Sequence, residues 1–237
     1  MTGQIAVVIG AGGGIGGALV TALAGSGRYA RIHAFARHAP ADAGIVMGGT
    51  IDVTDEAAIA RAAAVVTASP DLVLIATGIL HQDGRMPEKA LRDLDADTLA
   101  RTFAINTIGP ALVLKHFAPL LPRDRRSVIA ALSARVGSIG DNRSGGWYGY
   151  RASKAALNMI VRSAAIELAR SRPQAICVGL HPGTVATSLS APFQRGVAPG
   201  RLFAPADAAR QLLAVIDGLD SAGTGRVFAW DGAEIVP

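Results

Sequence analysis

The stretch that indicates the fold lies near the start of the chain, and it reads Ile5-Ala6-Val7-Val8-Ile9-Gly10-Ala11-Gly12-Gly13-Gly14-Ile15-Gly16-Gly17. Its first five residues are apolar, as in a strand buried on both faces, and an apolar segment with helical spacing begins at Ile15. The glycines between them permit a tight turn, and they let the backbone approach a phosphate at the helix N-terminus. We therefore predict a strand, a dinucleotide-binding loop and a helix.

The glycines of this loop fit two spacings. Gly10, Gly14 and Gly16 give G-x-x-x-G-x-G. Gly12, Gly14 and Gly17 give G-x-G-x-x-G. No lysine follows the glycines, so a Walker-type loop is not expected.

Beyond this unit, short apolar runs alternate with longer helical patterns. The predicted strands are Ile5–Ile9, Ile32–Phe35, Leu72–Ala76, Val128–Leu132, Ala175–Leu180 and Val227–Trp230. The predicted helices lie near Ile15–Ala24, after Thr54, near Thr98–Phe117 with a kink at Pro110, after Tyr148–Tyr150 and after Ala204. This alternation is typical of a Rossmann fold, a doubly wound parallel sheet with helices on both faces. Because no linker or repeat divides the chain, we expect a single α/β domain over residues 1–237.

The composition is unusually apolar, with 50% hydrophobic residues, 17% charged residues and a mean hydropathy of +0.35. The longest apolar stretch, residues 62–80, is interrupted by Pro70 and Asp71, so we expect helix, turn and strand rather than a membrane span. No basic segment precedes the first strand, so no signal peptide is expected. The excess of apolar residues favours subunit contacts, in a homodimer or homotetramer.

Charge and cysteine usage narrow the class further. The net charge is +5, but the arginines are scattered, and no basic stripe with interleaved aromatic residues indicates nucleic-acid binding. The single cysteine, Cys177, lies in an apolar run and cannot form an internal disulfide, which favours a reduced, cytoplasmic compartment. The five histidines have no partner cysteines, so no metal site is predicted.

The end of the second predicted strand bears on the choice of cofactor. An acidic residue there accepts a hydrogen bond from the ribose of NAD, whereas an arginine accommodates the 2′-phosphate of NADP. The chain has Arg37 at this position and no acidic residue before Asp42. We therefore predict NADP(H) rather than NAD, with a solvated arginine as the alternative interpretation.

A second pattern lies at the start of the fourth predicted helix, where Tyr150 precedes Lys154 by four residues. On a helix these positions share a face, with Cβ atoms about 5–6 Å apart. A nearby ammonium lowers the pKa of a phenol from about 10, so the pair suits acid–base chemistry near neutrality. Chance also produces this spacing, but the glycine loop upstream favours the catalytic interpretation. Tyr148 lacks such a partner, because Ala152 stands four residues after it.

Taken together, these motifs resemble the classical short-chain dehydrogenase/reductase family over nearly the whole chain. The resemblance implies a cofactor site formed by Gly10, Gly14, Ile15, Gly16, Arg37, Asp52, Val53, Ala76, Thr77, Gly78, Pro182, Gly183, Val185 and Thr187. It places Asn106, Tyr150 and Lys154 in the active site, in contact with the cofactor. The stretch from Ser133 to Tyr150 is similar more specifically to the C-factor and sniffer-type carbonyl reductase branch.

The chain departs from the family pattern in its serine. The family's serine usually stands three residues before a glycine, and the register set by Gly137 puts Ala134 there. Ser133 lies one position earlier, where a regular strand turns the side chain to the other face. Ser138 is the competing candidate. We favour Ser133, since backbone at a strand end is often irregular, and the choice stays open.

Two further departures concern the cofactor site. Ile9 stands where a threonine is frequent, and Ile75-Ala76-Thr77-Gly78 stands where the family's fourth strand commonly ends in Asn-Asn-Ala-Gly. Gly78 keeps the close approach of the backbone, so we expect cofactor binding to persist.

The resemblance implies a reaction in which hydride passes between a nicotinamide and a substrate carbonyl carbon. Tyr150 is expected to donate or accept the proton, and Lys154 to bind the nicotinamide ribose. A serine is expected to hold the carbonyl oxygen, and Asn106 to organise a water relay behind Lys154. Whatever the chemistry, fold alone does not settle function. The alternative, which Ala134 favours, is therefore a cofactor-binding regulatory or signalling protein with little or no activity.

The expected substrate is a small, apolar carbonyl compound or secondary alcohol. Long loops tend to carry function. We therefore expect the loops near residues 137–149 and 187–201 to form its pocket, with Ser138, Tyr148 and Phe193 in the lining.

Overall fold

The computed structural model describes residues 3–81 and 84–237. Its main sheet has the strand order β10-β9-β6-β5-β4-β1-β2-β3, and all neighbouring pairs are parallel except β9 with β10. The strands are β1 (Gln4–Ile9), β2 (Tyr29–Ala36), β3 (Val46–Thr50), β4 (Leu72–Ile75), β5 (Ser127–Leu132), β6 (Ala175–His181), β9 (Val227–Ala229) and β10 (Glu234–Ile235). The two-residue strands β7 (Thr184–Val185) and β8 (Leu202–Phe203) form a separate small sheet.

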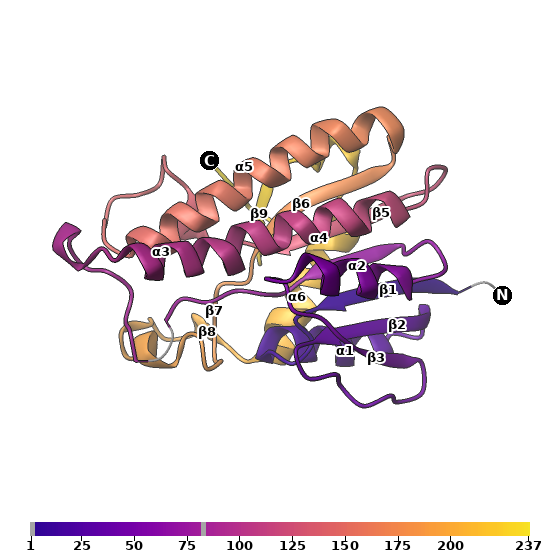
Figure 1. Ribbon diagram of the computed structural model, residues 1–237, viewed down its shortest axis with the longest axis horizontal. Helices are drawn as coiled ribbons and strands as arrows, with labels where there is room; N and C mark the ends of the chain where they lie inside the picture. The colour runs from indigo at the N-terminus through magenta and orange to yellow at the C-terminus, as the bar shows by residue number, and fades with distance from the viewer. Residues whose placement is uncertain (1–2, 82–83) are drawn as a thin grey trace.

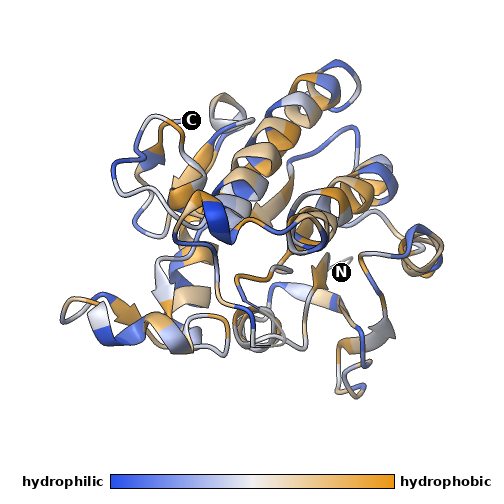
Figure 2. Cartoon of the chain, turned by 60° about the vertical axis from the view of Figure 1, so that its left-hand side comes forward, coloured by the Kyte–Doolittle hydropathy of each residue, from blue (hydrophilic) through white to orange (hydrophobic). Residues whose placement is uncertain are grey.

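Helices cover both faces of the sheet (Figure 1). One face carries α1 (Gly14–Gly25) and α6 (Pro205–Gly218), which pack against each other. The other carries α2 (Glu56–Ala64), α4 (Gly109–Phe117) and the long α5 (Tyr148–Ser171). Figure 2 shows hydrophobic residues along the central helices and strands, with hydrophilic residues gathered in the outer loops. The predicted single-domain, doubly wound α/β fold is confirmed.

Strand β3 is absent from the predicted strands, because its two central residues, Gly48 and Gly49, weaken the strand pattern. The structure shows why glycine stands there. A Cβ at Gly48 would lie 1.7 Å from the carbonyl oxygen of Pro40, and one at Gly49 would lie 2.4 Å from the ring of Phe35. Because neighbouring groups approach so closely, both positions require glycine. The same two glycines are the reason that the sequence does not predict this strand.

The long helix predicted near Thr98–Phe117 is interrupted one turn before Pro110. The chain forms α3 (Ala96–Phe103), then a π-helical segment, η2 (Ala104–Ile108), and then α4 with Pro110 in its first turn. Proline lacks the N–H that would bond to the carbonyl four residues back, so the ladder is already irregular before it. Single π-helical turns are frequent at functional sites, and this one contains Asn106.

The carboxyl ends of the parallel strands meet at one edge, where open α/β sheets bind their ligands. Within the described residues, no helix combines the length and apolar character needed to cross a membrane. The same residues contain no group of three His, Cys, Asp or Glu side chains suited to hold a metal ion.

Candidate active site

The glycine loop joins β1 to α1. Of the two predicted spacings, the structure requires glycine most strictly in the first, G-x-x-x-G-x-G, which begins at Gly10. Gly10 has φ +92°, a conformation that favours glycine, and a Cβ there would lie 2.8 Å from the Ala76 carbonyl carbon. A Cβ at Gly16 would lie only 2.1 Å from the Gly10 carbonyl oxygen. The corresponding distances for Gly12 and Gly17 are 3.3 Å, which are much less restrictive.

The N-terminus of α1 is open to an anion. Gly13 stands at the N-cap without a side chain to accept a hydrogen bond, and the first turn contains no acidic residue. The first N–H groups of a helix need partners, and a phosphate supplies them. Thr187 lies against this turn from the segment after β7, since a Cβ at Gly14 would be 2.7 Å from its Cγ2 atom.

The segment after β4 adds a polar atom that needs a partner. Thr77 Oγ1 is buried, and no hydrogen bond to it is present within the described residues. Buried hydroxyl groups are normally hydrogen-bonded, so this one fits a ligand that brings a polar atom next to the glycine loop. Its methyl group is 3.2 Å from the Cβ position of Gly10. The loop, the open helix and Thr77 together fit a dinucleotide.

The ends of β2 and β3 carry the residues expected at the adenosine end. Arg37 is exposed directly after β2, and Ile51 donates its N–H to the Ala36 carbonyl oxygen, which aligns the two strand ends. The Asp52 carboxylate accepts hydrogen bonds from Thr54 N and Oγ1 at 2.9 and 2.7 Å. These bonds, with a smaller contribution from the charge of Arg37, lower the pKa of Asp52. Val53 is buried beside them.

The predicted turn after β6 also reaches this edge. Gly183 has φ +74°, and a Cβ there would lie 2.6 Å from the ring of Phe203 and 3.0 Å from that of Trp230. Pro182 precedes it, and Val185 follows in β7. The turn therefore needs glycine for both its conformation and its packing.

Tyr150 and Lys154 lie on consecutive turns of α5. Lys154 is buried, and its Nζ atom donates to the Leu132 carbonyl oxygen at 2.7 Å and lies 5.9 Å from the centre of the Tyr150 ring. Burial raises the pKa of Tyr150 to about 12 and lowers the pKa of Lys154 to about 8. Burial favours the neutral form of both groups, so in the protein alone the pKa of Tyr150 is raised, opposite to the lowering that the Tyr–Lys spacing predicts.

Asn106 connects the β4 turn to α5. Its Oδ1 atom accepts from Ile79 N at 2.8 Å, and its Nδ2 atom donates to Ile79 O at 2.9 Å and to Ser153 Oγ at 3.1 Å. A Cβ at Gly78 would be 3.4 Å from Asn106 Oδ1 and 3.5 Å from Lys154 Nζ. The fully buried asparagine, the lysine and the turn therefore converge on one point.

Neither candidate serine lines the cavity beside Tyr150. Ser133 is buried and donates to Asn158 Oδ1 at 2.6 Å. Ser138 is also buried, and its Oγ atom accepts from Asp141 N at 3.0 Å. Ala134 continues in extended conformation after β5. A catalytic role for Ser133 or Ser138 stays a prediction, and Ser133 would have to give up its bond to Asn158 to donate to a substrate.

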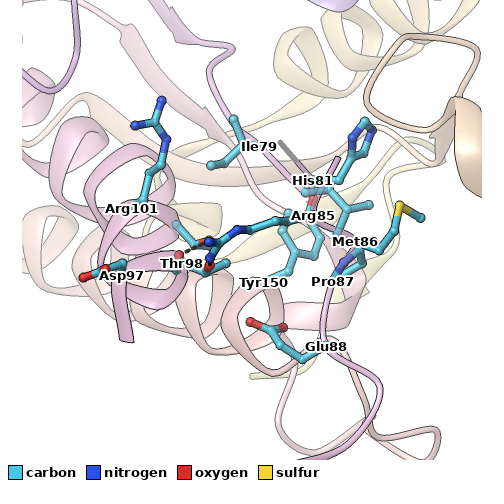
Figure 3. Close-up of a pocket in the computed structure, with 12 residues that line it drawn as sticks. Ile79, His81, Arg85, Met86, Pro87, Glu88, Asp97, Thr98, Arg101 and Tyr150 are labelled. Carbon is cyan, nitrogen blue, oxygen red and sulfur yellow. Dashed lines mark hydrogen bonds between the residues drawn. The ribbon is translucent and has the colours of Figure 1, made fainter. Parts of the chain in front are cut away.

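A cavity of about 320 Å³ opens at Tyr150 (Figure 3). It is formed by the segment after β4 and by α3, and its lining residues are Ile79, Leu80, His81, Arg85, Met86, Pro87, Glu88, Asp97, Thr98, Arg101, Thr102 and Tyr150. None of these lining residues belongs to the loops near residues 137–149 and 187–201. Their expected role in a pocket stays a prediction.

Phe193 nevertheless lies close to this cavity through a series of ring contacts. Its ring centre is 6.0 Å from that of His81 and 5.0 Å from that of Trp147, which in turn is 6.3 Å from that of Tyr150. Tyr148 is half-buried at the first turn of α5 and is not among the lining residues.

Sequence reasoning missed the lining residues on the segment after β4, above all His81, Arg85 and Glu88. These residues form no recognisable sequence motif, so only their position in the predicted fold could have indicated a role in the site. They follow Gly78 at the carboxyl end of a central parallel strand, where the rule for doubly wound sheets places ligands.

The fold and these residues define a dinucleotide-binding α/β protein of the oxidoreductase class. The family model described as short chain dehydrogenase matches residues 4–197, and the chain belongs to this family.

Individual relatives agree with this assignment. The chain is 42% identical to C-signal of Myxococcus xanthus over 147 residues, which cover 62% of this chain and 82% of the relative. It is 34% identical over 194 residues to 1-hydroxy-2-glutathionyl-2-methyl-3-butene dehydrogenase of Rhodococcus sp. (strain AD45), covering 81% and 80% of the two chains.

Solved structures share the fold over the full length of both chains. The NADPH-bound carbonyl reductase from chicken fatty liver has a TM-score of 0.85 at 23% identity, and the carbonyl reductase Sniffer of D. melanogaster one of 0.83 at 22%. Together with the match to C-signal, these similarities confirm the predicted resemblance to the C-factor and sniffer-type branch.

Proposed function

We propose that this protein is an NADP(H)-dependent reductase or dehydrogenase that acts on the carbonyl group or the secondary alcohol of a small molecule. The observation that carries the proposal is the convergence of Lys154, Asn106 and the Gly78 turn beside Tyr150, at the mouth of a cavity. A merely structural tyrosine would not need a cavity and a buried cation at the same place.

The cofactor would supply a hydride in reduction and accept one in oxidation. The open N-terminus of α1 and Thr77 would hold its phosphates, and Lys154 would hold the nicotinamide ribose. The exposed Arg37 favours NADP over NAD, because its guanidinium suits a 2′-phosphate. The likeness to an NADPH-bound carbonyl reductase supports the same choice.

Tyr150 would give its proton to the carbonyl oxygen in reduction and remove one from the alcohol in oxidation. Its hydroxyl is protonated at neutral pH, since burial raises its pKa to about 12. This state suits the reductive direction directly.

The cavity lining suggests a substrate of mixed polarity. Ile79, Met86 and Pro87 suit the apolar compound that the sequence predicts, whereas His81 and Arg85 offer donors to polar substituents. The proposal therefore covers small carbonyl compounds that carry a polar group.

We place the protein in the cytoplasm, consistent with the buried free thiol of Cys177.

The test is turnover by the purified protein with NADPH and a panel of ketones, aldehydes and quinones. We expect NADPH oxidation with at least one of these classes, and its loss in Tyr150→Phe with NADPH binding retained. In the same assay, Ser133→Ala and Ser138→Ala would separate the two serines, because a lost donor at the carbonyl oxygen lowers kcat on the order of 100-fold.

Tight NADPH binding without turnover on any class would overturn the enzyme proposal. That result would favour the alternative, a cofactor-binding regulatory or signalling protein. Ala134 at the family's serine position and the similarity to C-signal give this alternative its support.

A further inference from the structure

The helix that carries Tyr150 begins without a cap of its own. Trp147 occupies the N-cap position of α5 with φ +51°, it makes no capping bond through its side chain, and the first turn contains no acidic residue. The N–H groups at the start of a helix lack partners within the helix. At this end of α5 the partners must come from elsewhere.

Glu88, 61 residues before Gly149 in the chain, supplies acceptors for two of the N–H groups at this helix end. Its Oε2 atom accepts a hydrogen bond from Gly149 N at 3.1 Å, and its backbone oxygen accepts one from Trp147 N at 2.5 Å. Gly149 leaves room for this approach, since a Cβ there would lie 2.9 Å from Glu88 Oε1 and 3.0 Å from Leu99. The carboxylate thus takes the place of an N-cap side chain.

The environment of Glu88 suits this role. The residue is 6% exposed, and a buried carboxylate is unfavourable unless it is hydrogen-bonded or faces positive charge. The N-terminus of a helix provides both, through its N–H groups and the positive end of its dipole.

The segment that holds Glu88 is itself fixed to the start of α3 and to the turn before it; we call residues 85–90 the wall segment. Arg85 Nη1 donates to Asp95 Oδ1 and to Thr98 Oγ1, both at 2.8 Å. The N–H groups of Lys89 and Ala90 donate to Asp93 Oδ2 at 3.1 and 3.0 Å. Glu88 therefore contacts α5 from an anchored position.

Tyr150 follows Gly149 directly, and its own carbonyl group is also held by a side-chain hydrogen bond. Ser153 Oγ donates to the Tyr150 carbonyl oxygen at 2.8 Å and accepts from Asn106 Nδ2. Glu88 and Tyr150 also line the same cavity, with Glu88 below the tyrosine in the view of Figure 3.

We propose that Glu88 is a positioning residue for the reaction: its carboxylate caps α5 at Gly149 and thereby fixes Tyr150 toward the cavity. The residue acts through the first turn of the helix and takes no part in proton transfer. This inference rests on the proposed function, because it takes Tyr150 as the acid.

The test compares Glu88→Ala, which removes the acceptor, with Glu88→Gln, which keeps an amide oxygen at the same place. Glu167→Ala is the matched control, since this glutamate is exposed near the other end of the same helix. We expect kcat to fall about tenfold or more in Glu88→Ala, as loss of a cap loosens the first turn. Glu88→Gln should stay within about threefold of the wild type. The affinity for NADPH should be unchanged in all three variants.

A second measurement does not depend on turnover. Hydrogen exchange at the Gly149 amide should accelerate about tenfold in Glu88→Ala and stay near the wild-type rate in Glu88→Gln and Glu167→Ala. If the wild type turns over no substrate but the exchange pattern holds, the capping role stands and the proposed reaction fails. Unchanged exchange in Glu88→Ala would overturn the inference. A loss of kcat in Glu88→Gln equal to that in Glu88→Ala would also overturn it, since a chemical role would then be indicated.

Discussion

Lys154, which we propose as part of the active site, also bears on stability, because its side chain is buried. It lies at the contact of α5 with the end of β5, and within the part of the chain that the structure describes its ammonium has one hydrogen-bond acceptor, the Leu132 carbonyl oxygen. A buried cation with a single acceptor is unfavourable, which is why burial lowers its pKa to about 8. A lysine without a function at this place would be a poor choice for folding.

This placement predicts a pH dependence of stability. Between the folded pKa of about 8 and the ordinary value of 10.5, the unfolded chain binds the lysine proton and the folded chain does not, so stability rises with pH. From about pH 7.5 to 9.5 we expect the wild type to gain about 2 kcal/mol in free energy of unfolding relative to Lys154→Met. Urea denaturation at both pH values measures this difference.

The control for this prediction is Lys115→Met, which removes a lysine whose side chain is 62% exposed. It should show no comparable dependence on pH. The range ends below pH 10, because the raised pKa of Tyr150 acts in the opposite sense above the ordinary value of 10.0. A constant difference between the wild type and Lys154→Met would contradict a lysine of lowered pKa.

At the scale of the elements, the β1–α1 turn is the part with the least freedom to vary. A Cβ at Gly16 would lie 2.1 Å from a backbone oxygen, which cannot move without opening the turn. We expect Gly16→Ala to weaken NADPH binding at least about tenfold and to lower the free energy of unfolding by about 1–3 kcal/mol. Fluorescence titration with NADPH and urea denaturation measure the two effects.

Gly25→Ala is the matched control, because it lies in the same helix and a Cβ there meets nothing within 4 Å. Alanine has a higher helix propensity than glycine, so the free energy of unfolding of this variant should rise by about 0.5–1 kcal/mol. Its affinity for NADPH should equal that of the wild type. Equal NADPH binding by Gly16→Ala and the wild type would remove the glycine loop from the cofactor site.

The elements differ in how far the sequence predicts them. The buried parallel strands and α1 are evident because burial on both faces leaves an unbroken apolar run, as in β1. Strand β3 is hidden by Gly48 and Gly49, which are set by contacts with Phe35 and Pro40 far from the local pattern. Pro110 indicates that the helix before it is irregular, but the hydrogen bonds of Asn106 to Ile79 and Ser153 are tertiary, and no local pattern records them.

At the scale of the whole molecule, the candidate site also contains residues that the sequence predicts and residues that it does not. Residues set by backbone geometry, such as Gly10 and Gly16, follow from the sequence motif. Residues such as Glu88 and Arg85 do not, because their roles come from helices that pack against them. Tyr150 and Lys154 are intermediate: helical spacing brings them together, but only the fold reveals the burial that sets their pKa values.

The α4 and α5 face gives a prediction about assembly. Apolar side chains that are 49–66% exposed lie on α5, at Met159 and Ile166, and at the start of α4, at Ile108. Met159 and Ile166 are two helical turns apart, so they share one face of α5. We propose a homodimer or homotetramer with this face at the interface, and sedimentation at about micromolar concentration should show it.

The double variant Met159→Glu, Ile166→Glu should be monomeric, since charge at the centre of an apolar interface disfavours association. Val65→Glu replaces an exposed apolar residue outside these helices and should leave the assembly intact. A monomeric wild type would contradict the proposed interface.

The bond between Glu88 and the start of α5 also has a consequence for engineering. The wall segment is an obvious target for anyone who wishes to redirect this protein to new compounds, because it borders the cavity. Yet one of its six residues, Glu88, also holds the turn that carries Tyr150. A library that randomises the whole segment would confound selectivity with turnover, whereas one that leaves Glu88 and Gly149 untouched would let the two be tuned separately.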